Sequence, residues 1–177
     1  MNWKTTIITV ALSLVANIAP AQDKIEGAFG KKLGDVFDPS KAIGKDALTD
    51  GTPMYQFTPD KPFRSFKKYY VLITPTTHKI YGIWGIGSVE NTATGKKEQA
   101  LIMQLLQQKY GTKQKEGVMD GLYDIQQVTQ GNRRVLTKIT GIIDATIDIR
   151  YYDSDLEKAA ETERLELESK KVDGSGL

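Results

Sequence analysis

The sequence predicts an α+β fold: an antiparallel sheet built from hairpins, with two main helices, one after each group of strands. Three observations lead to this prediction. Runs of β-branched and aromatic residues are paired across short turns, an apolar helical pattern follows the first pair, and a charged helical pattern lies near the C-terminus. Strand groups followed by helices are typical of α+β proteins, and we expect both helices on one side of the sheet.

The segment from 27 to 37 allows two interpretations, a helix with an apolar stripe or a short strand that runs into a turn. Gly30 and Gly34 argue against a helix interior. Residues 38–53 are rich in proline and glycine and are expected to form a loop. Residues 54–58 form the next predicted strand, and prolines at both of its ends suggest a sheet edge.

The clearest hairpin pairs residues 66–74 with 78–86 around a three-residue turn. A helix is predicted from Lys96 to Lys109. Gly111 then stands where a left-handed C-terminal cap is expected. The apolar stripe of this helix consists of Leu101, Ile102, Leu105 and Leu106.

The second half repeats this order. Residues 122–129 and 133–139 flank a predicted turn at 130–132, and residues 145–152 alternate between apolar and polar side chains. Ser154 and Glu157 have the spacing of a capping box, which predicts a charged helix up to about Lys171.

Composition limits the function. The 177 residues are 40% hydrophobic and 26% charged, a balance typical of a single globular domain. With 24 Lys and Arg against 22 Asp and Glu, the formal charge of +2 does not favour a nucleic-acid partner. The absence of cysteine excludes thiol catalysis, disulfide bonds and thiolate metal sites. We expect no cofactor and no metal.

Residues 1–21 are typical of a signal peptide. Lys4 supplies the positive charge, residues 7–16 are apolar, and the small residues Ala19 and Ala21 predict cleavage after Ala21. A retained membrane anchor is the less favoured alternative, because polar residues and a proline leave the apolar stretch too short to span ~30 Å of hydrocarbon. We expect a single domain from 22 to 171, a flexible tail from 172 to 177, and no stable membrane insertion. Without cysteine, export fits a bacterial periplasm, or secretion, best.

Two groups of residues were considered for catalysis. His78 is the only histidine, but no nucleophile motif accompanies it. Asp144 and Asp148 lie four residues apart on a predicted strand, but Arg150 shares their face, which favours a solvated surface. The glycines of residues 82–87 lack the order of a phosphate-binding loop, and we expect them to make room for large neighbours.

The first hairpin is apolar on both faces. If Thr74 pairs with His78, Tyr70 and Trp84 share one face, and Gly82 lies opposite Tyr70. Phe66, Leu72, Ile80 and Ile86 are also expected on that face. We expect the hairpin to be covered on both sides, because large exposed apolar patches are rare on monomers. If one face is open, Tyr70 and Trp84, together with His78 at the turn, are the expected binding residues.

Four stretches, FGKKLGDVFDP, YQFTP, FKKYYVLITPTTHKIYGIW and IDIRYYDSDLEKAAETE, carry a resemblance. Over nearly the whole length after residue 21, the chain resembles small exported bacterial proteins of unknown function. The shared features are Phe29, Gly30, Leu33, Gly34, the Tyr69-Tyr70 strand and Tyr151-Tyr152-Asp153. The resemblance implies an exported α+β domain and no particular activity.

The leading hypothesis is a periplasmic, non-enzymatic binding or accessory protein that recognises an envelope protein or a small ligand. The alternative is a small periplasmic hydrolase that uses His78 or the Asp144/Asp148 pair. A third hypothesis, an envelope-assembly factor, rests on fold-level analogy.

Overall fold

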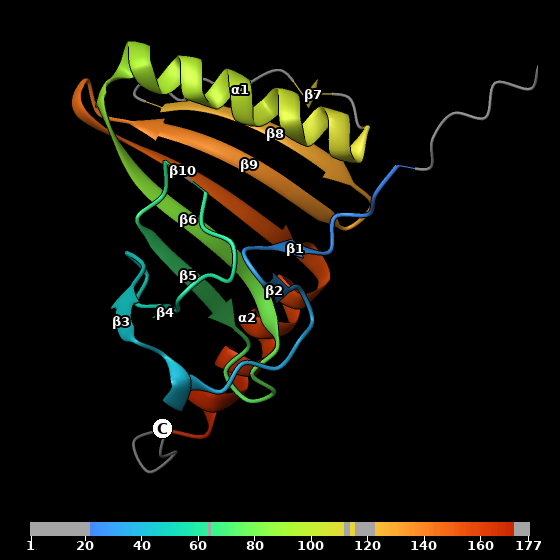
Figure 1. Ribbon diagram of the computed structural model, residues 1–177. Coiled ribbons are helices and arrows are strands. Elements are labelled where there is room, and N and C mark those ends of the chain that lie inside the picture. The colour runs from blue at the N-terminus through green and yellow to red at the C-terminus, as the bar shows by residue number, and fades with distance from the viewer. Residues whose placement is uncertain (1–21, 64, 112–113, 116–122, 172–177) are drawn as a thin grey trace, which may run out of the picture.

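The computed structural model describes residues 22–63, 65–111, 114–115 and 123–171 (Figure 1). The predicted signal peptide and the predicted tail lie outside these residues. The strands are β1 Gly27–Ala28, β2 Lys31–Lys32, β3 Gly44–Ala47, β4 Pro53–Gln56, β5 Lys68–Ile73, β6 Ile80–Asn91, β7 Gln114–Lys115, β8 Tyr123–Gln130, β9 Arg133–Thr140 and β10 Ile143–Asp153. The helices are η1 Pro39–Lys41, α1 Thr92–Tyr110 and α2 Ser154–Ser169. Among the described residues, no helix is long and apolar enough to span a membrane.

Eight strands form one antiparallel sheet in the order β3-β4-β5-β6-β10-β9-β8-β7, and β1 and β2 form a separate small hairpin (Figure 1). The fold is α+β, as predicted, with a helix after each group of strands. The long strands β6 and β10 pair in the middle of the sheet and join its two halves. The predicted edge at residues 54–58 is wrong. β4 lies inside β3, whose residues Gly44–Ala47 carry none of the β-branched or aromatic signal of a strand.

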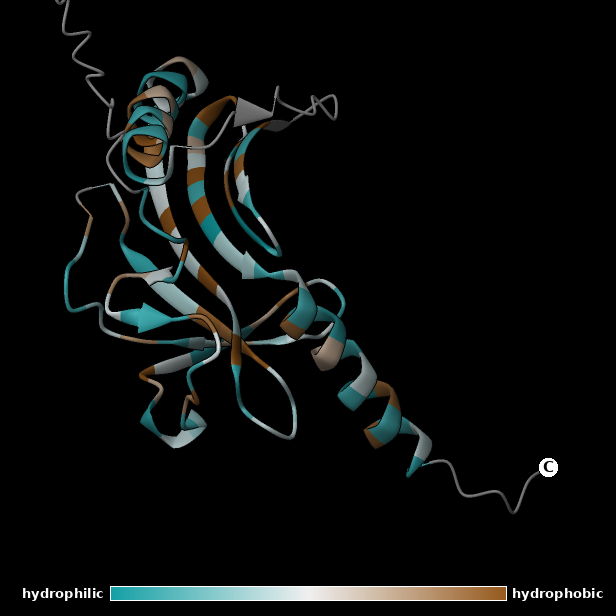
Figure 2. Ribbon diagram, turned by 90° about the vertical axis from the view of Figure 1, so that its right-hand side faces the viewer, coloured by the Kyte–Doolittle hydropathy of each residue, from teal (hydrophilic) through white to brown (hydrophobic). Residues whose placement is uncertain are grey.

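The two helices pack on opposite faces of the sheet, which corrects the expectation that both lie on one side. α1 buries Ile102, Met103 and Leu106 against one face, and α2 packs Ala160 and Leu156 against the other. Figure 2 shows the two helices on different sides of the strands. The central strands are apolar on both faces, so each face requires its own cover.

Side-chain and glycine caps define the helix ends. Gly111 ends α1 with a φ of 59°, as predicted, and Asn91 caps its start by accepting a hydrogen bond from the Thr94 amide. The predicted capping box at Ser154 is wrong. Asp153 is the N-cap of α2, where its carboxylate accepts hydrogen bonds from the amides of Asp155 and Leu156.

The register of the first hairpin differs from the prediction. Trp84, not Gly82, lies opposite Tyr70, and a register shift between Leu72 and Ile73 follows. The shift moves Ile80 to the face covered by α1 and brings Tyr81 to the face of Tyr70. Phe66, which precedes β5, also packs on the α1 side. A shift of one residue exchanges the faces of the β6 side chains beyond it, which explains the errors at Ile80 and Tyr81. Phe66 lies outside the strand, where alternation does not apply.

Candidate functional site

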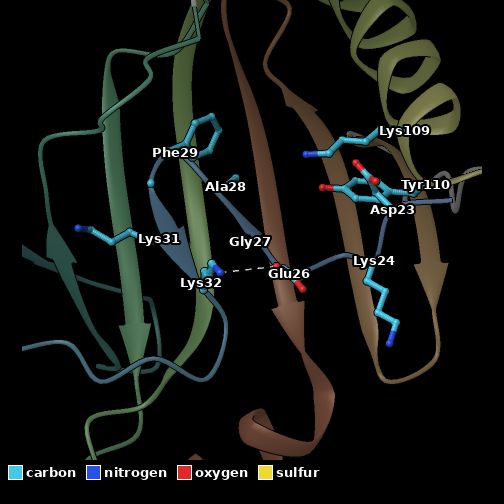
Figure 3. Close-up of a pocket in the computed structure, with 11 residues that line it drawn as sticks. Asp23, Lys24, Glu26, Gly27, Ala28, Phe29, Lys31, Lys32, Lys109 and Tyr110 are labelled. Carbon is cyan, nitrogen blue, oxygen red and sulfur yellow. Dashed lines mark ion pairs between the residues drawn. The ribbon is translucent and has the colours of Figure 1, made fainter. Parts of the chain in front are cut away.

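A hollow of the surface lies between the C-terminal end of α1 and the β1–β2 hairpin (Figure 3). Its volume is about 500 Å³, within the usual range for ligand sites. Residues 23–32 of the N-terminal segment form most of its wall, and Lys109 and Tyr110 close it from α1. We call this space the α1–β1 hollow.

The N-terminal wall of the hollow is fixed by hydrogen bonds to distant parts of the chain. The Ile25 amide donates to the side chain of Gln130 over 2.8 Å, and the Ile25 carbonyl accepts from Arg133 over 2.9 Å. Asp23 donates its amide proton to the carbonyl of Lys109 over 3.2 Å. Ile25 itself is fully buried. The wall is therefore tied to both α1 and the β8–β9 turn.

The α1–β1 hollow is rich in positive charge. Lys24, Lys31, Lys32 and Lys109 line it together with two carboxylates, Asp23 and Glu26. Glu26 is already engaged with Lys32 in an exposed ion pair of 3.7 Å. Lys109 extends from α1 across the hollow toward the side on which Phe29 lies (Figure 3), and no described carboxylate lies within 4 Å of its ammonium.

An apolar pocket adjoins the hollow and shares two of its walls, Phe29 and Lys109. Its volume is about 160 Å³, close to the roughly 150 Å³ of an apolar cavity that accepts a benzene ring. We call it the Phe29 pocket. Its other walls are Phe63, Phe66, Ile102, Leu105, Leu106, Ile149 and Tyr151. Leu105 remains 45% exposed at this site, unusual for a leucine beside so much apolar surface.

Phe29 holds its place at a cost in backbone strain. It and Gly30 form the two-residue turn between β1 and β2, with φ values of 58° and 85°. Two positive φ angles in such a turn favour Asn-Gly, and a phenylalanine in the left-handed region is strained. The ring packs edge-on against three aromatic rings, with distances between ring centroids of 4.9 Å to Tyr69, 6.0 Å to Phe66 and 6.2 Å to Tyr151. Backbone strain of this kind concentrates at functional sites.

Phe63 and Phe66 form a second wall of the Phe29 pocket. Together with Ser65 we call them the pocket loop, and Tyr69 holds it. The Tyr69 hydroxyl accepts a hydrogen bond from the Phe63 amide at 2.9 Å and lies 3.2 Å from the Phe63 and Phe66 carbonyls. Ser65 donates a hydrogen bond from its hydroxyl to Glu98 on α1. The loop is thus fixed to both the sheet and the helix.

Glycines in β6 allow this loop and Phe29 to lie against the sheet. A Cβ atom at Gly87 would stand 1.8 Å from the carbonyl oxygen of Ser65, and one at Gly85 would stand 3.1 Å from the Phe66 ring. At Gly82, on the other face, a Cβ atom would meet Leu72 at 3.0 Å. The expectation that these glycines make room for large neighbours is therefore confirmed at Gly82 and Gly85, whereas Gly87 makes room for the backbone of Ser65.

The buried polar groups near the pocket are tyrosines. Burial raises the pKa of the Tyr151 hydroxyl, and the neighbouring Tyr110 raises it further. Both side chains are almost fully buried. The Tyr151 hydroxyl is therefore neutral at physiological pH and adds hydrogen-bonding capacity without charge.

Comparisons with protein-family models, curated proteins and solved structures give no match for this chain. The resemblance to small exported bacterial proteins therefore stays a prediction, and the site has to be interpreted from its own geometry.

Tyr70 and Trp84 lie on the opposite face of the sheet from the Phe29 pocket. Tyr70 is buried and donates a 2.6 Å hydrogen bond to Asp46. Trp84 is 5% exposed, and the Arg150 guanidinium covers its ring at 3.8 Å. The hairpin is thus covered on both faces, as expected. A binding role for these two aromatic residues stays a prediction.

The expectation of a solvated face around Asp148 is wrong. Arg150 forms two hydrogen bonds with the Asp148 carboxylate, of 2.8 and 2.9 Å, and Asp148 is only 4% exposed. Burial raises the pKa of Asp148, and the hydrogen bonds from Arg150 reduce this effect. Asp144 is exposed at the start of β10. Four residues of strand separate the two carboxylates by about 13 Å, too far for the 5–9.5 Å spacing of glycosidase pairs.

His78 belongs to the β5–β6 turn at one end of the sheet, whereas Asp148 lies in the middle of β10. The φ of His78 is 52°, its amide donates to the Thr74 carbonyl, and it borders a separate hollow of about 350 Å³ beside Arg164. Asp148 pairs with Ile86, eight residues further along β6, which corresponds to about 25 Å. The structure does not bring together the residues of the hydrolase alternative.

Sequence reasoning missed the Phe29 pocket, although two signals were present. The apolar stripe of α1 is wider than its buried face. Ile102 and Leu106 are buried, whereas Leu101 and Leu105 of the same stripe are exposed. The second signal is a phenylalanine directly before a glycine in a turn, where a small polar residue is usual.

Proposed function

We propose that this protein is an exported, periplasmic, non-enzymatic binding protein whose small ligand occupies the α1–β1 hollow and the Phe29 pocket. The strained Phe29 is the observation that carries the proposal. The backbone conformation of this turn favours Asn or Gly, but the position is occupied by a phenylalanine whose ring lines an apolar pocket. Such a cost persists when the side chain contributes to function.

The walls of the site support a binding role because hydrogen bonds within the chain hold them in place. These bonds fix the N-terminal segment through Gln130 and Arg133, and fix the pocket loop through Tyr69. A preformed site loses little conformational entropy on binding. An apolar pocket with a few polar groups at its border is the usual form of a small-molecule site.

Leu105 provides a direct test of ligand binding in the Phe29 pocket. A panel of small aromatic and aliphatic compounds, both charged and neutral, would be tested by ligand-observed NMR with the purified protein. We expect some members to bind, and Leu105→Trp, which places an indole over the pocket, to abolish that binding. Leu101→Trp is the matched control, since Leu101 is 36% exposed one turn away and does not line the pocket.

Two results would count against the proposal: no compound binds, or both tryptophan variants bind the panel like the wild type. Phe29→Asn is a second variant. It relieves the strained turn but removes the ring and its three aromatic contacts, so binding should fall, and the relief of strain should offset part of the packing loss in the free energy of unfolding.

Export is tested separately. When the full chain is expressed in a bacterial host, N-terminal sequencing of the periplasmic fraction should find Gln22 first. Cleavage there keeps the walls of the hollow, because the described hydrogen bonds of the N-terminal wall begin at Asp23. An intact Met1 on a membrane-bound protein would contradict the prediction.

A further inference from the structure

We infer that the ligand is an amphipathic anion, whose apolar end is about the size of one benzene ring and whose carboxylate or phosphate lies beside Lys109. This inference rests on the proposed function and specifies its ligand class. Two observations carry it, namely the size and lining of the Phe29 pocket and the charge of the adjoining hollow.

The Phe29 pocket sets the apolar end. Its volume of about 160 Å³ admits one six-membered ring or a short acyl chain. Phe29, Phe63 and Phe66 offer ring edges and faces to an aromatic ligand, and Ile102 and Ile149 supply aliphatic contact. Apart from Tyr151, whose hydroxyl lies beside Tyr110, the described wall offers no polar side chain except Lys109.

Lys109 sets the charged end because it lines both spaces. Its side chain joins an apolar methylene stem to an ammonium that stands 5.2 Å from the centre of the Tyr110 ring. A ligand with its ring in the Phe29 pocket therefore places the next few atoms beside this ammonium. Because Phe29 and Lys109 lie together where the two spaces meet, the site favours an amphipathic ligand over a purely apolar one.

The remaining charges favour an anion over a cation. Glu26 is paired with Lys32, which leaves Asp23 as the second carboxylate of a lining that also carries Lys24, Lys31 and Lys109; of these three lysines, Lys109 extends across the hollow (Figure 3). Lys31 also stands over the Phe57 ring at 5.3 Å. A cationic ligand head would meet like charge in this hollow, whereas an anionic head would meet ammonium groups.

The large polar space fits a head group bigger than a bare carboxylate. The α1–β1 hollow is about three times the volume of the Phe29 pocket, at about 500 Å³ against about 160 Å³. The natural ligand is therefore expected to carry further polar atoms beyond its anionic group. A small aryl carboxylate should bind as a minimal fragment of it.

Three compounds with one tail and different heads test the inference by isothermal titration calorimetry. They are 3-phenylpropionate, 3-phenylpropanol and 3-phenylpropylamine. We expect the carboxylate to bind at least tenfold tighter than the amine, with the alcohol between them. Raising the NaCl concentration should weaken the binding of 3-phenylpropionate and leave the affinity for 3-phenylpropanol unchanged, because salt screens only the charged head group.

Lys109→Met assigns the effect to one side chain. Methionine retains an apolar stem for the pocket wall, so the affinity for 3-phenylpropanol should be preserved while that for 3-phenylpropionate falls about fivefold. Lys97→Met is the matched control and should change neither affinity. Lys97 is an exposed lysine of α1 that lines neither space.

Equal or tighter binding of the amine, or equal effects of the two lysine variants, would overturn the inference. Absence of binding by all three compounds would also overturn it. In that case the wider panel with Leu105→Trp decides separately on the proposed function. If other compounds bind the wild type and Leu105→Trp abolishes their binding, the proposed binding function is supported and only the assigned ligand class is wrong.

Discussion

Replacement of Gly87 by alanine is a sharp test of how the Phe29 pocket is built. The backbone of Gly87 has no positive φ, so a substitution there tests space rather than chain conformation. An added Cβ atom would stand 1.8 Å from the Ser65 carbonyl oxygen and 2.8 Å from its carbon. Both atoms belong to the backbone of the pocket loop, so a change of side-chain rotamer cannot relieve the clash.

The loss of unfolding free energy in Gly87→Ala follows from the displacement of the pocket loop. Real Cβ atoms essentially never come closer than 3.0 Å to such neighbours, so the loop must move by about 1 Å or more. Overpacking of this kind costs about 1–3 kcal/mol, and displacement weakens the Tyr69 hydrogen bonds at about 1 kcal/mol each. We expect a loss of about 3 kcal/mol, or about 10 °C in Tm for a domain of this size.

Urea denaturation monitored by circular dichroism measures this loss, with Gly131→Ala as the control. Gly131 has a φ of 61° and nothing within 4 Å of an added Cβ atom, so alanine there costs only backbone strain, about 1 kcal/mol. The reasoning would be refuted if Gly87→Ala were no more destabilising than Gly131→Ala. The variant should also bind 3-phenylpropionate more weakly, because its pocket wall has moved.

Three other substitutions test the packing of the second face and of α2. Asp153→Ala removes the N-cap of α2 together with the ion pair to Arg133, and should lower the free energy of unfolding by at least about 1–2 kcal/mol in urea denaturation; an unchanged midpoint would exclude this role. Trp84→Ala empties a covered core position and should cost about 3–5 kcal/mol, whereas a loss below 1 kcal/mol would indicate an open face. Desolvation alone would raise the pKa of Glu163, but hydrogen bonds from the β5–β6 turn outweigh it and hold the pKa below its ordinary 4.5. The carboxylate therefore stabilises the fold above pH 4.5, so wild type should be more stable than Glu163→Gln at pH 7, and the difference should shrink as the pH falls below 4.5; a pH-independent difference would contradict this.

The features predicted correctly are those in which local chemistry decides the structure. Alternation in residues 145–152 places Ile147 and Ile149 on the buried α1 side because a strand turns each successive side chain to the other face. Gly111 ends α1 because a left-handed cap costs glycine little. The paired β-branched runs form β5 and β6, and the residues around Gly131 form a turn, because these patterns depend only on neighbours in the chain.

Local patterns in the chain are therefore enough to predict the α+β class and most of its elements. Which face each helix covers and where the candidate site lies were decided by the tertiary structure. Phe29 and Lys109 are eighty residues apart in the chain, and the strands of the sheet bring them to one boundary. Lys109 carries no local signal of a site, since a lysine in the last turn of a helix is commonplace. Its role depends on its distance from a strained ring, and that distance is set by the packing of α1, β10 and the N-terminal hairpin together.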